Sequence, residues 1–170
     1  MKNVLLLTIL FLAVSSCEEP KQTKFDKMGV SFTCPKGWSI TDQESIEGQG
    51  YYLAAEKDGF TSSGLVTFSW IDGEFNLNEW LKVNKETLGE NFVMQNADIK
   101  FGDVEYDKYN GIQTLSMTFT ASLLGVDHEG KLQVFHKSNK TFATLSQGAI
   151  EDRSENKDGF AGIEGSFKVE

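Results

Sequence analysis

The residues of this chain with the most reactive side chains are its two cysteines, Cys17 and Cys34. A cysteine reacts as its thiolate, which forms at neutral pH when a neighbouring cation or a helix N-terminus lowers the thiol pKa. No histidine or arginine lies near Cys34 in the sequence, and Lys36 alone is a weak source of such a shift. We therefore interpret Cys34 as a small buried apolar residue rather than a nucleophile.

The two histidines are candidates for a catalytic base or a metal ligand. His128 lies in the run Asp127-His128-Glu129, which we predict to be a turn between strands. Three adjacent residues in a turn rarely converge on one metal ion, so a surface turn is the preferred interpretation. His136 shares a face of a predicted strand with Leu132 and Val134. A hydrogen-bonded sheet histidine is therefore favoured over a catalytic base.

Carboxylates are plentiful, since 25 of the 170 residues are acidic, but no motif arranges them for catalysis or metal binding. The sequence contains no calcium-binding loop of the EF-hand type, no His-Glu-x-x-His, no Gly-x-Ser-x-Gly and no phosphate-binding glycine loop. We therefore expect no catalytic residues, no metal site and no cofactor. The net charge of −9 repels phosphate backbones, which argues against a nucleic-acid partner.

Hydroxyl side chains form the pattern that points most directly to binding. In the predicted strand 112–122 they alternate with apolar residues, so they share one face of the sheet. The candidate binding residues on this face are Thr114, Ser116 and Thr118, with Thr144 and Ser146 from a second strand. Thr67 and Ser69 are possible extensions of it. Either these residues face solvent because threonine is a good strand former, which is the simpler interpretation, or the face receives a polar ligand or partner.

The first seventeen residues direct the chain to a membrane. Lys2 precedes an apolar run over 4–14, which two serines and Cys17 follow, and this order is typical of a secretory signal peptide. The run of 11 residues is shorter than the roughly 20 that a membrane-spanning helix needs. Val14-Ser15-Ser16-Cys17 is similar to the lipobox of bacterial lipoproteins, which implies that Cys17 is lipidated and becomes the mature N-terminus.

These features divide the chain into a signal peptide over 1–16, a lipidated Cys17 with a polar tether over 17–27, and one domain over 28–170. The expected location is the bacterial cell envelope, on an outer-membrane, periplasmic or surface face, through the lipid anchor. Lipidation would leave Cys34 without a partner. Cleavage after Ser15 would instead release a soluble chain in which both thiols could pair.

Strands dominate the elements that must position these residues. Alternation and turn signals predict strands over 30–34, 38–40, 51–56, 65–71, 99–104, 112–122, 132–137 and 141–147. A helix is predicted from Leu77, with Asn76 as its cap, Glu79 completing a capping box and Gly89 at its end. A shorter helix is predicted over 158–165. Few helices among consecutive antiparallel strands indicate an α+β domain, an antiparallel sheet flanked by helices.

Two short motifs resemble a known family. Residues 29–38, GVSFTCPKGW, are similar to the F-x-x-P-x-G-W opening of PsbP-like domains. Residues 160–167, FAGIEGSF, resemble the closing F-x-x-I-x-x-S-F of that family. The resemblance covers about residues 25–169. It implies the Mog/PsbP fold, which has no common catalytic residues, and together with the signal sequence it points to the envelope-lipoprotein branch.

The combined expectation is a non-enzymatic, lipid-anchored envelope protein that binds another protein as an adaptor or accessory factor. The alternative is a lipoprotein that binds a small ligand on its hydroxyl-lined sheet face. Trp38 is a further candidate for that face, because its ring could stack on a ligand, although a core position is the simpler interpretation.

Overall fold

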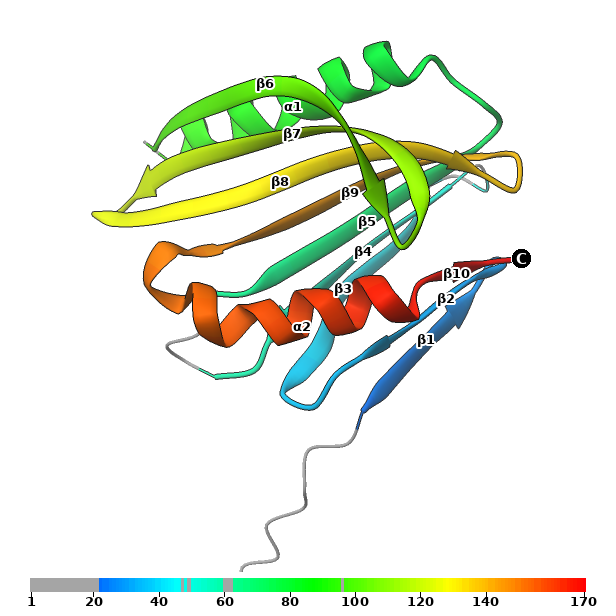
Figure 1. The fold of residues 1–170 in the computed structure, drawn as a ribbon, viewed down its shortest axis with the longest axis horizontal. Coiled ribbons are helices and arrows are strands. Elements are labelled where there is room, and N and C mark those ends of the chain that lie inside the picture. The colour runs from blue at the N-terminus through cyan, green and yellow to red at the C-terminus, as the bar shows by residue number, and fades with distance from the viewer. Residues whose placement is uncertain (1–21, 47, 49, 60–62, 96) are drawn as a thin grey trace, which may run out of the picture.

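Two antiparallel sheets and two helices make up the described chain, which is an α+β domain as the sequence predicted (Figure 1). The structure is a computed structural model that describes residues 22–46, 48, 50–59, 63–95 and 97–170. The small sheet has the order β1-β2-β10 and the large sheet the order β3-β4-β5-β9-β8-β7-β6. The strands are β1 Thr23–Lys27, β2 Val30–Cys34, β3 Trp38–Ile46, β4 Gly50–Lys57, β5 Leu65–Asp72, β6 Asp98–Tyr109, β7 Ile112–Leu123, β8 Val126–Lys137, β9 Lys140–Ala149 and β10 Lys168–Val169.

Helix α2 (Arg153–Ser166) and the small sheet cover one face of the large sheet. A short 3-10 helix, η1 (Ile150–Asp152), leads from β9 into α2. The core between these layers is built largely of aromatic rings. Phe68 of β5 stacks on Phe32 of β2 and on Phe167, at centroid distances of 4.9 and 5.3 Å. Burial of such large apolar side chains is the main favourable contribution to folding, so this cluster fixes α2 and the small sheet in place.

Helix α1 (Leu77–Met94) packs on the opposite face, against β6, β7, β8 and β9. The Asn76 side chain caps it by accepting hydrogen bonds from the backbone N–H groups of Asn78 and Glu79. The predicted end at Gly89 is wrong, because the helix continues to Met94. The extra turn buries Phe92 against Phe119 of β7, which compensates for a glycine inside the helix.

Several strands start earlier or end later than the sequence predicted. The run Asp127-His128-Glu129, expected in a turn, belongs to β8, and the turn lies at Leu124 and Gly125, both with positive φ. Pairing with β7 and β9 on both sides satisfies the backbone of this polar stretch. The predicted tether over 17–27 also changes, because Thr23–Lys27 forms β1 and its Phe25 is buried.

Candidate functional site

The strand register brings the predicted hydroxyl residues together on the α2 side of the large sheet. Gln133 of β8 lies between Ser116 of β7 and Thr144 of β9. One row further along, Lys131 lies between Thr118 and Ser146. The five predicted residues therefore share one face, interleaved with two β8 side chains that the sequence did not single out.

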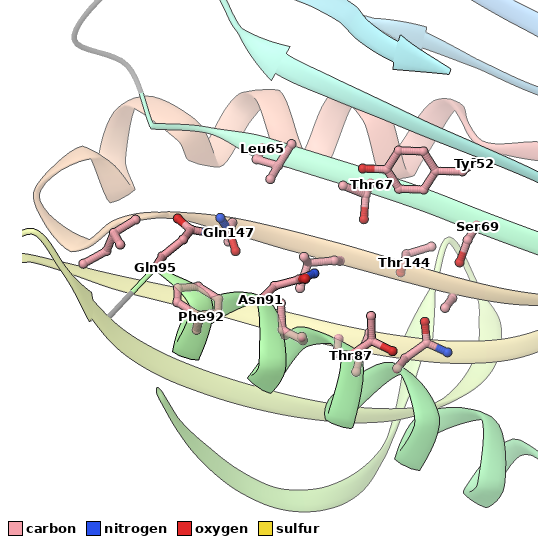
Figure 2. Close-up of a pocket in the computed structure, with 16 residues that line it drawn as sticks. Tyr52, Leu65, Thr67, Ser69, Thr87, Asn91, Phe92, Gln95, Thr144 and Gln147 are labelled. Carbon is pink, nitrogen blue, oxygen red and sulfur yellow. The ribbon is translucent and has the colours of Figure 1, made fainter. Parts of the chain in front are cut away.

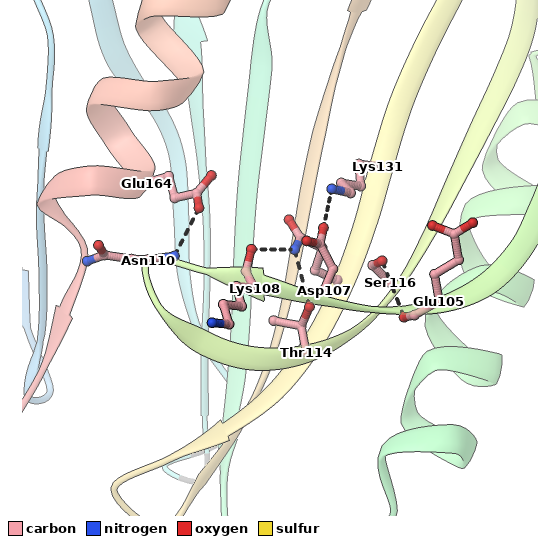
Figure 3. Close-up of polar contacts among 9 residues, drawn as sticks. Glu105, Asp107, Lys108, Asn110, Thr114, Ser116, Lys131 and Glu164 are labelled. Carbon is pink, nitrogen blue, oxygen red and sulfur yellow. Dashed lines mark hydrogen bonds and ion pairs between the residues drawn. The ribbon is translucent and has the colours of Figure 1, made fainter.

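Part of this face is buried rather than open to solvent. Thr114, Ser116, Gln133 and Thr144 are all buried, so the interpretation of these residues as solvent-facing strand formers is wrong for this stretch. The Gln133 amide donates to Thr114 Oγ1 at 3.3 Å, and Ser116 Oγ donates to the Glu105 carbonyl at 3.4 Å (Figure 3). Both distances are long, so these hydrogen bonds are weak.

Two adjoining cavities, which we call the α2 cleft, lie between this face and α2. The smaller, of about 290 Å³, is lined by Gln133 and Thr144 among others, and the larger, of about 550 Å³, by Thr118 and Asn156 among others. Lys131, Ser146 and Phe160 line both cavities, so the two lie side by side.

Several polar groups of the α2 cleft lack a partner within the described residues. Thr144 and Ser146 make no side-chain hydrogen bond there. Asn156, from α2, is fully buried, and neither atom of its amide has a hydrogen-bond partner in the described chain. Buried polar groups are normally paired, so an unpaired group beside a cavity indicates a place where a ligand or water can bind.

Two ion pairs border the α2 cleft. Lys131 pairs with Asp107 of β6 (Figure 3), and Arg153 at the start of α2 pairs with Glu129 of β8. The hydrogen bond from Lys131 holds the pKa of Asp107 below its usual value, and that from Arg153 does the same for the pKa of Glu129. The border therefore carries fixed charges of both signs.

The β6–β7 turn attaches to the C-terminal part of α2, at the end of the cleft. The backbone N–H of Asn110 donates to Glu164 at 2.9 Å (Figure 3). The side-chain amide of Asn110 donates to the Phe167 carbonyl at 2.8 Å. Asn110 and Gly111 adopt the positive φ angles that a tight hairpin turn requires. This contact lies beside the smaller cavity, which Tyr109 and Glu164 line.

The other candidate residues lie elsewhere. Trp38 is buried in the core against Phe160, at a centroid distance of 5.4 Å, and is not part of the hydroxyl-bearing face. The possible extension through Thr67 and Ser69 is wrong, because Phe68 between them faces Thr144 and they project to the α1 side. Cys17 and the predicted signal peptide lie outside the described residues.

The groups considered for catalysis lie apart from one another. His136 Nε2 lies 2.7 Å from the Phe75 carbonyl oxygen, the hydrogen-bonded sheet position that the sequence favoured. Burial raises the pKa of the Cys34 thiol to about 11, which keeps it protonated. Within the described ranges no three His, Cys, Asp or Glu residues are placed to hold a metal ion, and no helix is long and apolar enough to cross a membrane.

Sequence reasoning missed Lys131, Gln133 and Asn156. The first two sit at alternate positions of β8, as the hydroxyl residues do on β7. Gln133 already lies in the predicted strand 132–137, and extending that strand towards Val126 would have added Lys131. Asn156 carries no such signal, because only the docking of α2 places it at the cleft.

Comparison with solved structures identifies the architecture. The cyanobacterial PsbP protein CyanoP of Synechocystis sp. PCC 6803 aligns over 91% of this chain and 96% of its own, with a TM-score of 0.59 and 11% identity. This chain has the PsbP-like fold. A Bacteroides thetaiotaomicron protein aligns over 89% of this chain with a TM-score of 0.58 and 11% identity, and the match spans 49% of that longer protein. No protein-family model and no curated protein sequence matches the chain.

Proposed function

We propose that this chain is a non-enzymatic binding protein of the bacterial envelope, and that its ligand is a small polar molecule held in the α2 cleft. The observation that carries the proposal is the fully buried Asn156 amide, which has no partner within the described residues. The Thr144 and Ser146 hydroxyls, which make no side-chain hydrogen bond there, line the same cleft. Leaving a buried polar group such as the Asn156 amide unpaired costs about 1–3 kcal/mol, which a ligand with donors and acceptors would recover. The larger cavity, about 550 Å³, falls within the range of small-molecule sites.

A lipid on Cys17 would hold this domain close to the bilayer. Because β1 begins at Thr23, the connection to Cys17 is six residues and extends about 20 Å at most. Several acyl chains, as in the lipoproteins that the lipobox resembles, make such anchoring durable. Mass spectrometry of the mature N-terminus tests this part of the proposal, and an unmodified Cys17 thiol would contradict it.

The ligand proposal is tested by thermal unfolding of the detergent-solubilised full chain with amino acids, dipeptides, nucleosides and short polyols. A ligand at 100 times its Kd raises the free energy of unfolding by about 2.7 kcal/mol. Replacing Thr118 by Lys or Ser146 by Leu should abolish that gain, because both residues line the cleft. The control is Ser122→Lys, a change at an exposed β7 residue outside the cleft lining. Thr114 is unsuitable, because it is 2% exposed and a lysine there would disrupt folding.

The outcomes separate the site from the function. If no compound raises the unfolding temperature of the unmodified chain, small-ligand binding of these classes is wrong. If a compound stabilises the Ser146→Leu variant as much as the unmodified chain, the α2 cleft is not where it binds.

A protein partner is the second candidate function, favoured by apolar side chains at the C-terminal end of α1. Val93 and Met94 are 67% and 74% exposed and lie beside Phe101. Affinity capture with the lipidated chain should lose its specific partner when both are replaced by Ser. Val83→Ser, on the same helix and also exposed, is the matched control. Equal capture by all three chains would exclude this surface.

A further inference from the structure

A second groove lies on the opposite face of the large sheet, between α1 and strands β4, β5 and β9 (Figure 2). This α1 groove has a volume of about 410 Å³. Thr87 and Asn91 come from the helix, while Tyr52, Thr67 and Ser69 come from the strands. Its position is independent of the α2 cleft, since the sheet separates them.

The lining of the α1 groove carries no charged side chain among the described residues, although 24% of the chain is charged. A charged ligand there would lose water without gaining an opposite charge, which is unfavourable. The net charge of −9 selects against polyanions. The neutral lining selects against cations, because it offers them no carboxylate. The ligand that fits is therefore uncharged.

Open hydrogen-bonding groups line both walls of the groove. Asn84 is engaged, because its amide donates to the Trp80 carbonyl at 2.8 Å. Seven other polar lining side chains have no side-chain hydrogen bond within the described residues; they are Tyr52, Thr67, Ser69, Thr87, Asn91, Gln95 and Gln147. Burial and the nearby Asp42 and Glu56 raise the pKa of Tyr52, so its phenol stays neutral and able to donate. Hydroxyls and carboxamides each both donate and accept, as the hydroxyl groups of a sugar do.

The floor of the groove argues against an extended peptide. Peptides that bind along a sheet use the free edge of a strand. Here β5 is paired on both sides, with β4 and β9, so its backbone groups are already used. The floor instead offers apolar contact from the half-buried Leu65 and Leu145, against which the C–H faces of a sugar ring can pack.

From this juxtaposition we infer that the α1 groove binds a neutral oligosaccharide. The amides and hydroxyls of both walls hydrogen-bond the sugar hydroxyls, and the apolar floor receives the ring faces. The volume is that of a small-molecule site, which fits a few sugar units rather than a long chain.

The test measures binding of maltohexaose, cellohexaose, xylohexaose and mannohexaose to the detergent-solubilised full chain by isothermal titration calorimetry. We expect at least one to bind, and Asn91→Asp to weaken it roughly tenfold, because a carboxylate cannot donate the hydrogen bond that the amide gives to a sugar hydroxyl. Asn78→Asp is the matched control, an identical change at an exposed α1 residue outside the groove. Thr118→Lys, in the α2 cleft, should leave oligosaccharide binding unchanged.

Three results would overturn the inference. The first is that none of the four hexasaccharides binds the unmodified chain. The second is that Asn91→Asp and Asn78→Asp bind as the unmodified chain does. The third is tighter binding of an anionic probe, hexagalacturonate, than of every neutral one. Because Thr118→Lys reports on the other face, failure here is distinguishable from failure of the α2 cleft.

Discussion

Replacing Gly159 by Ala should destabilise the domain, although alanine is the better helix former. Gly159 lies on the buried side of α2, over the ring of Trp38. A Cβ atom there would lie 2.3 Å from Cε2 and Nε1 of that ring and 2.5 Å from Cζ2. Trp38 has little room to move away, since it is 4% exposed and a Cβ at Gly64 would also lie 2.6 Å from it.

Two effects of opposite sign decide the magnitude. Alanine is favoured over glycine inside a helix by about 0.8–1.0 kcal/mol. Inserting a methyl group into a well-packed core costs about 1–3 kcal/mol, and contact with three ring atoms puts Gly159→Ala at the upper end. The net loss is therefore about 2 kcal/mol. In a domain of this size that lowers Tm by roughly 4–8 °C.

Gly162→Ala on the same helix is the matched control. A Cβ at Gly162 would lie 3.6 Å from Cβ and Cγ of Pro35, an ordinary van der Waals contact. Only the preference of alanine over glycine inside a helix remains, so the free energy of unfolding of Gly162→Ala should rise by about 1 kcal/mol. Urea unfolding and thermal unfolding of both variants measure the difference, about 3 kcal/mol. A Gly159→Ala protein as stable as the unmodified chain would refute the view that Trp38 and α2 are in close, rigid contact.

Three further predictions concern single groups. Burial raises the pKa of the Cys34 thiol from 9.0 to about 11, so its thiolate should be roughly a hundredfold scarcer in the folded chain. Cys34 should therefore react roughly a hundredfold more slowly with iodoacetamide in the folded chain than in guanidinium. Equal rates would contradict its burial. In the β8–β9 turn, Ser138 and Asn139 have φ values of 50° and 56°, a region that glycine adopts more easily than other residues. In urea titrations, Ser138→Gly should therefore raise the free energy of unfolding by a few tenths of a kcal/mol. Ser138→Val should lower the free energy of unfolding. The pair between Asp107 and Lys131 lowers the pKa of the carboxyl below 3.8, so its stabilisation is present above that pH and lost as the pH falls through the folded value. Because both side chains are more than a third exposed, the pair contributes only about 0–1 kcal/mol, and Asp107→Asn should lose that amount at pH 7 but not at pH 2.

Regular alternation is what made the large sheet predictable. In β7 the apolar Leu115, Met117 and Phe119 face the α1 core, as the sequence indicated, and the hydroxyl residues face the other way. A period of two determines the face of every residue once one is placed, so the shared face of the hydroxyl residues followed from the sequence. The α+β class and the PsbP-like fold were predicted correctly for the same reason, since the alternation and the two short motifs locate consecutive strands.

Features that depend on distant contacts were not predictable. β1 is polar apart from Phe25, which stacks on Phe32 of β2 at 5.2 Å, and one inward residue in five gives no alternation. The turn of α1 beyond Gly89 exists because Phe92 reaches a buried position against another element. The α2 cleft and the α1 groove could not be predicted for the same reason. Each is lined by at least three elements, and no local sequence pattern indicates how those elements pack together.

The positions of the α2 cleft and the α1 groove follow from the widths of the large sheet and of the helices that cover it. Seven strands about 4.8 Å apart form a sheet of roughly 29 Å, whereas a helix with its side chains is about 10–12 Å across. One helix therefore cannot cover either face. On the α2 side the small sheet completes much of the cover, and the cleft lies where the α2 cover ends over β8 and β7. On the α1 side the helix covers β6 to β9, and on β4 and β5 the side chains become polar, at Tyr52, Thr67 and Ser69. The polar residues thus mark the limit of each helix's cover, which is why binding is proposed at these two places.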